Sequence, residues 1–248
     1  MKIALAQIAP KLSPDNQDIH ESIVREVEQV ADVVVFPELS LNGNMLKDAV
    51  WEDAFLLGEL TFFEALSEKI DIVVGAITKE EHKLYNSLLY YSRGQLLNLH
   101  HKKELVQDQK QVFSSGDVVK TFMTPYGKAM TITGDDLWSG EILDAVSRAK
   151  PAFLYVMTNA FVTGFDERGV VSEERYRKLL ATAAMLAGCE VIFVNRVGFE
   201  DGRGYWGGSQ VVDAGGRVRK SARLFEKEVL LISVDPHLSY IRKYLYHK

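Results

Sequence analysis

The chain has 248 residues, of which 47% are hydrophobic and 25% are charged, and its formal net charge is −5. These are ordinary values for a globular protein that buries one sizeable core, so we expect a single α/β domain over residues 1–248. The acidic balance argues against nucleic acid or a membrane surface as partner. A single cysteine, Cys189, excludes an internal disulfide framework and a cysteine-based zinc site. With no leader pattern and no bilayer-spanning apolar run, we expect a cytoplasmic protein.

The first 40 residues alternate strand and helix patterns. Residues 2–7 are strand-like, residues 16–30 place apolar side chains at helical spacing, and residues 33–36 form a continuous apolar run typical of a strand buried on both faces. Glu38 follows that run, and a carboxylate just beyond the C-terminal end of a central strand is well placed for a site. For an isolated glutamate, a solvated loop residue is the commoner alternative.

The next stretch continues with mixed patterns. We expect helices over residues 45–57 and 60–67, a buried strand over 71–77, and a hairpin of residues 84–91 and 95–99. A basic tract, His100-His101-Lys102-Lys103, then follows the hairpin. On its own, this tract reads as a solvated loop or, less readily, as a metal-binding run.

Residues 127–138 combine a turn, an apolar β-branched strand and a sharp break. The strand ends at Gly134, the residues Asp135-Asp136-Leu137-Trp138 follow, and a helix starts near Gly140. In α/β hydrolytic enzymes, a strand that turns tightly into a helix is where the nucleophile is held. Gly134 has no side chain, although glycine suits a strained turn.

The last 100 residues resume the alternation. Residues 153–158 read as a buried strand, residues 164–171 as a loop, and Ser172 as the N-cap of a helix that runs to about residue 187. The glycines of residues 202–209 make no phosphate loop, because no Gly-Lys-Ser/Thr follows. Strands at 217–223 and 229–234 and an aromatic terminal helix from Pro236 complete the chain, and we expect that tail to dock on the core or on a second subunit.

Three strings together resemble the nitrilase (carbon–nitrogen hydrolase) superfamily, and most closely its glutaminase branch, the amidase part of glutamine-dependent NAD synthetases. They are FPELS at 36–40, GDDLW at 134–138 and VIFVNRVG at 191–198. The resemblance covers almost the whole chain. It implies a four-layer α-β-β-α sandwich of one domain, which pairs as a homodimer.

The resemblance also implies roles for particular residues. Glu38 matches the general base, Lys102 the donor that stabilises the oxyanion, and the backbone amide of Asp135 a second oxyanion donor. Gly134 stands where the family has its nucleophilic cysteine. Asn159 and Phe161 match residues that line the acyl pocket, although helix capping is an alternative for Asn159.

Other positions match the family less clearly. Arg175 or Arg177 would pack beside the strand that carries the nucleophile. The family often has a second glutamate after the lysine, and none of the nearby candidates matches it cleanly: Asp108, Gln109 and Gln111. We expect Asp136 to be a structural carboxylate beneath the turn, and Cys189 to be a buried structural thiol.

The missing nucleophile decides what activity the sequence predicts. We expect this chain to bind a small-molecule amide or carboxylate, without a cofactor, and to be nearly inactive. Either it is naturally non-catalytic, as a binding or scaffold protein, or Gly134 was introduced into a working amidase. A third reading, a metal-dependent hydrolase on Glu38, Asp135 and Asp136, is weakened because Lys102 would compete with the cation and no histidine has the matching spacing.

Overall fold

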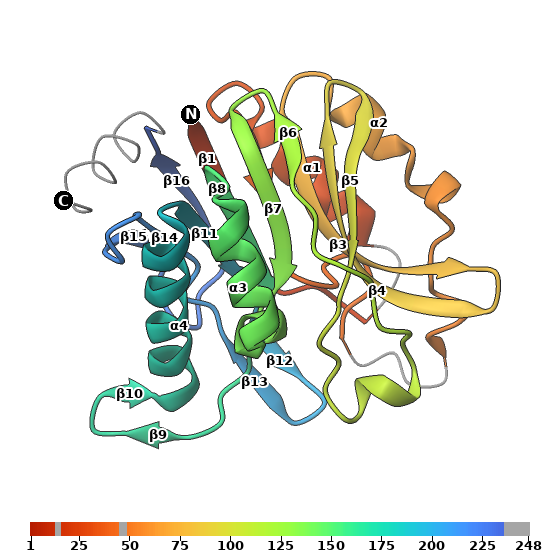
Figure 1. Cartoon of the computed structure of the whole chain (residues 1–248). Helices are drawn as coiled ribbons and strands as arrows, with labels where there is room; N and C mark the ends of the chain where they lie inside the picture. The colour runs from red at the N-terminus through yellow and green to blue at the C-terminus, as the bar shows by residue number, and fades with distance from the viewer. Residues whose placement is uncertain (13–15, 45–48, 236–248) are drawn as a thin grey trace.

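The computed structural model describes residues 1–12, 16–44 and 49–235, and its framework is a pair of six-stranded sheets (Figure 1). The first sheet has the order β16-β1-β2-β3-β4-β5, with the bounds Glu228–Ser233, Lys2–Gln7, Val33–Val35, Asp71–Glu80, Lys83–Ser92 and Gln95–His101. The second has the order β15-β14-β11-β8-β7-β6, with the bounds Val218–Ser221, Gln210–Val212, Glu190–Asn195, Phe153–Thr158, Gly127–Thr133 and Phe122–Thr124.

Each sheet has a parallel centre, made by β1, β2 and β3 in the first sheet and by β7, β8 and β11 in the second. The central residues of these strands are mostly apolar and buried, as expected for strands that are covered on both faces. One layer of buried side chains fills the space between the sheets, with contributions such as Leu5, Val35 and Tyr90 from the first sheet and Tyr155 and Ile192 from the second. The two sheets therefore pack face to face over a shared core.

Helices cover the outer face of each sheet. On the first sheet, α1 (Gln17–Val27) and α2 (Phe62–Leu66) enclose a second apolar cluster, and on the second sheet α3 (Gly140–Ala149) and α4 (Val171–Ala187) enclose a third. Figure 1 shows α3 and α4 lying side by side across the second sheet. The order helix, sheet, sheet, helix confirms the four-layer α-β-β-α sandwich. None of the described helices is long and apolar enough to cross a bilayer.

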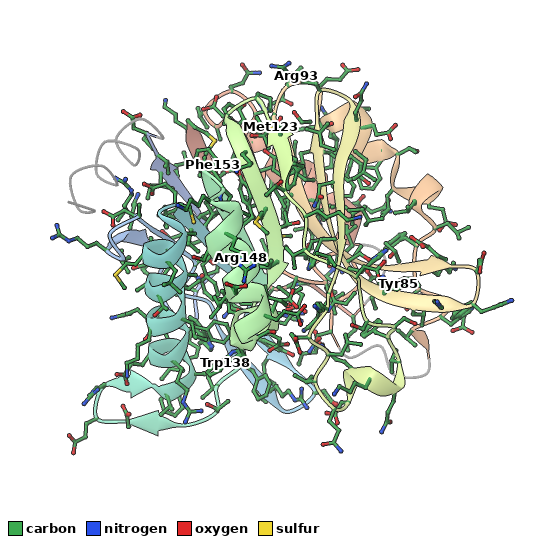
Figure 2. The ribbon with its side chains drawn as sticks, in the orientation of Figure 1. Tyr85, Arg93, Met123, Trp138, Arg148 and Phe153 are labelled. Carbon is green, nitrogen blue, oxygen red and sulfur yellow. The ribbon has the colours of Figure 1, made fainter. Side chains whose placement is uncertain are left out.

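The parallel strands of both sheets end at the same edge of the molecule, where the candidate residues gather. Glu38 lies three residues beyond β2, Lys102 directly follows β5, and Gly134 directly follows β7. In Figure 2 the label Trp138 marks this edge. Phe153, the first residue of β8, lies at the opposite end of the second sheet.

Four predicted elements are wrong in the described residues. The helix expected over 45–57 does not continue over residues 50–56, where the backbone of Phe55 instead pairs with Thr78 of β3. The loop expected at 164–171 contains a small ribbon of β9 (Phe165–Asp166) and β10 (Gly169–Val170).

The other two differences concern the basic tract and a helix start. His100 and His101 belong to β5 rather than to a loop after it. Ser172 lies inside α4, and its hydroxyl donates to the carbonyl of Phe161 instead of capping the helix. The terminal helix expected from Pro236 lies outside the described residues.

Candidate functional site

Glu38 is held in a buried corner beyond β2. Its side chain is 3% exposed and accepts three hydrogen bonds, from Asn86 Nδ2 at 2.6 Å, from Lys102 Nζ at 2.9 Å and from the backbone N–H of Asn159 at 3.0 Å. The next residue, Leu39, is buried and has a φ of 51°, in the left-handed region that non-glycine residues rarely adopt. The surrounding contacts therefore hold this corner in a strained shape that turns the carboxylate toward the second sheet.

Gly75 of β3 makes room for this corner. A Cβ atom at Gly75 would lie 2.5 Å from the backbone nitrogen of Leu39 and 2.6 Å from the carbonyl oxygen of Pro37. Such distances are too short for any side chain, so the close approach of two backbones requires glycine here.

Lys102 is 1% exposed and carries its charge into the same space. Its ammonium donates to Glu38 at 2.9 Å and to Asp135 Oδ2 at 2.5 Å. Its backbone is fixed by bonds to Asn86 on one side and Gly116 on the other. Two carboxylates therefore share one buried ammonium.

The pKa values follow from this arrangement. Burial raises the pKa of Glu38, and the charge of Asp135 raises it further, whereas the ammonium of Lys102 opposes both. Burial alone would lower the pKa of Lys102, but the charges of Glu38 and Asp135 outweigh it and raise that pKa. Lys102 is thus a permanently charged ammonium at neutral pH.

The turn after β7 is held by Asp136, which is fully buried. One carboxylate oxygen accepts from the backbone and hydroxyl of Thr133, both at 2.9 Å, and lies 3.1 Å from His100 Nε2. The other oxygen accepts from the backbone N–H groups of Lys103 and Glu104. Burial raises the pKa of Asp136, but these hydrogen bonds outweigh it and lower that pKa. Asp136 is therefore a structural carboxylate that ties the turn to the segment after Lys102.

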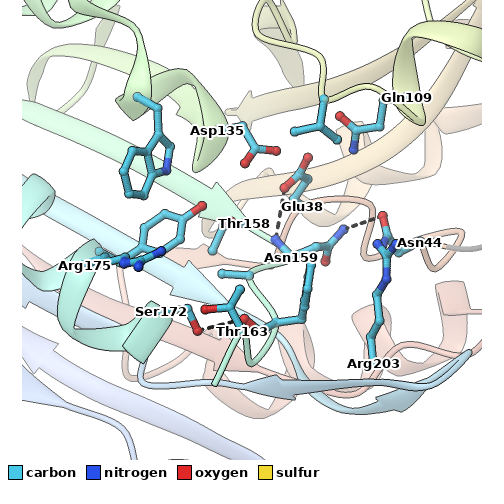
Figure 3. A pocket seen from close by; sticks show the side chains of 15 residues that line it. Glu38, Asn44, Gln109, Asp135, Thr158, Asn159, Thr163, Ser172, Arg175 and Arg203 are labelled. Carbon is cyan, nitrogen blue, oxygen red and sulfur yellow. Dashed lines mark hydrogen bonds between the residues drawn. The ribbon is translucent and has the colours of Figure 1, made fainter. Parts of the chain in front are cut away.

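A cavity of about 270 Å³ opens over Glu38 and Asp135, whereas Lys102, Gly134 and Asp136 are not among the residues that line it. Figure 3 shows Glu38 and Asp135 at its centre, with Arg175 and Arg203 on opposite sides. Aromatic side chains form much of the remaining wall, and they are Trp138, Phe161 and Tyr176. The pocket has the size and the mixed lining of a small-molecule site rather than of a groove for a polymer.

The structure places both expected pocket residues in this lining. Phe161 lines the pocket, and the guanidinium of Arg203 lies over its ring, 4.7 Å from the ring centre. Asn159 caps no helix, and its side-chain oxygen is buried without a hydrogen-bond partner among the described residues, as is that of Gln109. Of the two arginines considered, Arg175 lines the pocket, whereas Arg177 is exposed and pairs with Glu173.

Several site residues were missed from the sequence. Asn86, Thr158, Tyr176 and Arg203 all contact the site or line it. Only Asn86 carried a usable signal, because it is an amide inside an otherwise apolar strand. Tyr176 lies on α4 behind the pocket and was masked by the apolar helix pattern around it.

The described residues assemble no cluster of carboxylate, histidine or cysteine ligands for a metal. Asp136 turns its carboxylate away from Asp135, toward His100, and the ammonium of Lys102 lies between Glu38 and Asp135. His101 contacts Ser87 and Glu80, whereas His100 contacts Asp136. The two histidines therefore do not converge on one metal site. Cys189 is fully buried and precedes β11, at the opposite end of the sheet from Glu38.

Comparison with known proteins agrees with this architecture. The model of the carbon–nitrogen hydrolase family matches residues 2–244. A glutamine-dependent NAD(+) synthetase of Thermotoga maritima is 24% identical over 95% of this chain, which spans only 42% of that protein's length.

Solved structures show the same fold. A carbon–nitrogen hydrolase superfamily protein of Xanthomonas campestris superposes with a TM-score of 0.87 at 17% identity, covering 99% of this chain and 94% of the other. An amidase from Nesterenkonia sp. superposes with a TM-score of 0.83 at 20% identity, covering 100% of this chain and 95% of the other.

Proposed function

Because the chain belongs to the carbon–nitrogen hydrolase family, we propose that its pocket binds a small amide or carboxylate and turns it over slowly or not at all. The observation that carries the proposal is Gly134, which presents no side chain at the strand end beside Glu38 and Lys102. The chain is then a non-catalytic binding protein built on an amidase scaffold.

Amide cleavage through a thioester needs a nucleophile, a base that moves protons, and donors for the developing oxyanion. Glu38 has the position of the base and Lys102 that of a donor. The nucleophile is missing, and its removal from comparable covalent hydrolases costs on the order of a millionfold in turnover. The remaining groups can bind and polarise a ligand, but they cannot form the covalent intermediate.

Asp135 supports the same conclusion independently. Its carboxylate bonds to Lys102, so one ammonium faces two carboxylates in a buried space. An oxyanion formed there would meet an excess of negative charge, whereas catalysis requires stabilisation of that charge. The charges of this site therefore stabilise an unreacted bound ligand better than a tetrahedral intermediate.

The pocket's polar groups indicate the ligand class. Arg175 lines it and forms no ion pair with a residue that the structure describes, which suits a carboxylate. The oxygens of Gln109 and Asn159 lack hydrogen-bond donors within the described chain, which suits the N–H groups of an amide. A small molecule that carries both an amide and a carboxylate would pair with Arg175 and with the two amide oxygens.

Binding and turnover can be measured separately. We expect glutamine, its chain-length analogues or small neutral amides to raise the Tm of the protein, while ammonia release stays at the level of a protein-free control. Arg175→Ala should abolish the shift caused by carboxylate-bearing ligands but keep that of neutral amides. Arg177→Ala is the matched control and should change neither. Ammonia release at the rate of a working amidase, or the absence of a shift across the panel, would refute the proposal.

The competing reading is that Gly134 replaced a cysteine in an otherwise intact amidase. Retention of Glu38 and Lys102 favours it, and it predicts that Gly134→Cys alone restores ammonia release. The surroundings of Gly134, described below, argue against it.

Assembly remains a separate proposal. We propose that the chain pairs as a homodimer because the family resemblance implies it, and light scattering on the purified protein would test this. A cytoplasmic location also stays a prediction from the sequence.

A further inference from the structure

Gly134 does not owe its identity to backbone conformation. Its φ of −61° and ψ of −35° lie in the ordinary right-handed helical region, which any residue can adopt. The strained turn expected from the sequence is therefore absent at this position. A requirement for glycine must come from the space around it.

That space is occupied by the neighbouring strand. A Cβ atom at Gly134 would lie 2.5 Å from Cβ of Thr158, closer still to the Thr158 hydroxyl oxygen, and 3.0 Å from the hydroxyl of Tyr176. Non-bonded carbon atoms pack at about 3.5–4.0 Å, so a side chain at 134 overlaps Thr158.

Thr158 cannot easily move out of the way. Rotation about its Cα–Cβ bond would shift the hydroxyl but would leave Cβ where it is. Its backbone is fixed on both sides, because the carbonyl of Met157 accepts from Gly134 at 2.9 Å and the N–H of Asn159 donates to Glu38 at 3.0 Å. Relief would require the end of β8 to separate from β7, which would break one of these hydrogen bonds.

Tyr176 is equally constrained. Its ring packs against Trp138, Phe193 and Trp206, with ring centres between 5.6 and 6.1 Å apart. Its hydroxyl interacts with the side chain of Thr158. Two hydroxyl groups thus fill the volume beside the bare strand end, and both of their residues line the pocket.

We propose that Thr158 occupies the volume that a nucleophilic side chain at position 134 would need, so that glycine at 134 and threonine at 158 are coupled. This inference rests on the proposed non-covalent function and deepens it. A ligand's carbonyl group meets the hydroxyls of Thr158 and Tyr176 where a thiol would otherwise attack. Gly134 and Thr158 together then limit the site to non-covalent binding. A cysteine at position 134 alone therefore does not give an active amidase.

A double-mutant cycle on thermal stability tests the coupling without any ligand. We expect Gly134→Ala to lower the Tm by roughly 5 °C in the wild-type chain, as overpacking does in a domain of this size. In a Thr158→Gly background, which removes the clashing Cβ, the loss should shrink to a small fraction of that. Thr158→Ser is the matched control, because it keeps Cβ and the hydroxyl and should not rescue.

A second glycine calibrates the measurement. Gly140 has no atom within 4 Å of an added Cβ, so Gly140→Ala should leave the Tm unchanged or raise it slightly in every background. An equal loss from Gly134→Ala in all three backgrounds, or no loss in the wild type, would overturn the proposal.

Ammonia release gives an independent readout. We expect Gly134→Cys to stay inactive and Gly134→Cys combined with Thr158→Gly to release ammonia from small amides faster than either single variant. Equal rates for Gly134→Cys and the double variant would overturn the coupling. Failure of the proposed function would look different, because the wild-type protein itself would then release ammonia while the stability cycle still showed the coupling.

Discussion

Two strand-end corners lie beside the pocket, one from each sheet, and they differ in what their residues do. Glu38, beyond β2, keeps a buried carboxylate with three donors and a strained neighbour, Leu39. Gly134, beyond β7, has an unstrained backbone and no functional group. One corner holds buried charged groups, whereas at the other a bare backbone packs closely against Thr158.

The two corners are held by different contacts but share the end of β8. The Glu38 corner depends on the first sheet, on Gly75 and on the N–H of Asn159 just past β8, whereas the Gly134 corner depends on the contact between β7 and β8. The three hydrogen bonds that Glu38 accepts come from Asn86, Lys102 and Asn159, and none of them involves Gly134.

The largest expected effect comes from removing the shared ammonium. Lys102→Met should destabilise the protein by roughly 3–5 kcal/mol, because it leaves the buried carboxylate of Glu38 without its counter-ion beside Asp135. Urea unfolding followed by circular dichroism would measure this. Lys103→Met is the matched control, since its amine pairs with the exposed Glu141 and its loss should change little. Similar losses in both variants would show that the Glu38 corner is not electrostatically built.

Acid should weaken the Glu38 corner selectively through His20, which is buried and bonded to Ser40 Oγ at 2.9 Å. Burial lowers the pKa of His20 from 6.5 to about 4, so the unfolded chain takes up the proton first. The free energy of unfolding should therefore fall by up to about 3 kcal/mol as the pH drops from 6.5 to 4.

The control for this pH effect is His20→Gln, which cannot titrate in that range. Unfolding curves of both proteins at pH 7 and pH 4.5 should show a smaller acid loss in the variant. Parallel losses would mean that other groups, and not His20, govern acid stability.

A smaller effect is expected at the close approach beneath Glu38. Gly75→Ala forces a methyl group against the backbone of Leu39 and should cost roughly 1–3 kcal/mol. It should also displace the carboxylate and reduce any ligand-induced rise in Tm. Gly58→Ala has no atom within 4 Å of the added Cβ and serves as the control. A Gly75→Ala protein as stable as the control would mean that the strained corner relaxes freely.

Much of the fold was readable from the sequence because the buried strands are continuous apolar runs. The bounds of β8 were predicted without error at residues 153–158. The helix expected over 45–57 does not continue over residues 50–56 because the backbone of Phe55 bonds to Ile77 and Lys79 of β3, a tertiary pairing that overrides local apolar spacing.

The site was only half readable. Glu38 and Lys102 were identified by their motifs, and the structure brings their charged groups to 2.9 Å. The side-chain bond of Asp135 to Lys102 was not foreseen, because it joins residues 33 positions apart on different sheets. The crowding of Gly134 by Thr158 was equally hidden, since it depends on the separation of two neighbouring strands rather than on any spacing along the chain.

The buried carboxylate of Asp136 has a further consequence. It binds Thr133 at the end of one sheet and the backbone of Lys103 and Glu104, just past the end of the other. Together with the bond from Lys102 to Asp135, these contacts tie the ends of the two sheets to each other at this rim, and none of them involves an atom of residue 134. A side chain at 134 would therefore act on the pocket through Thr158 and the end of β8, while the join between β7 and the segment after β5 stays in place.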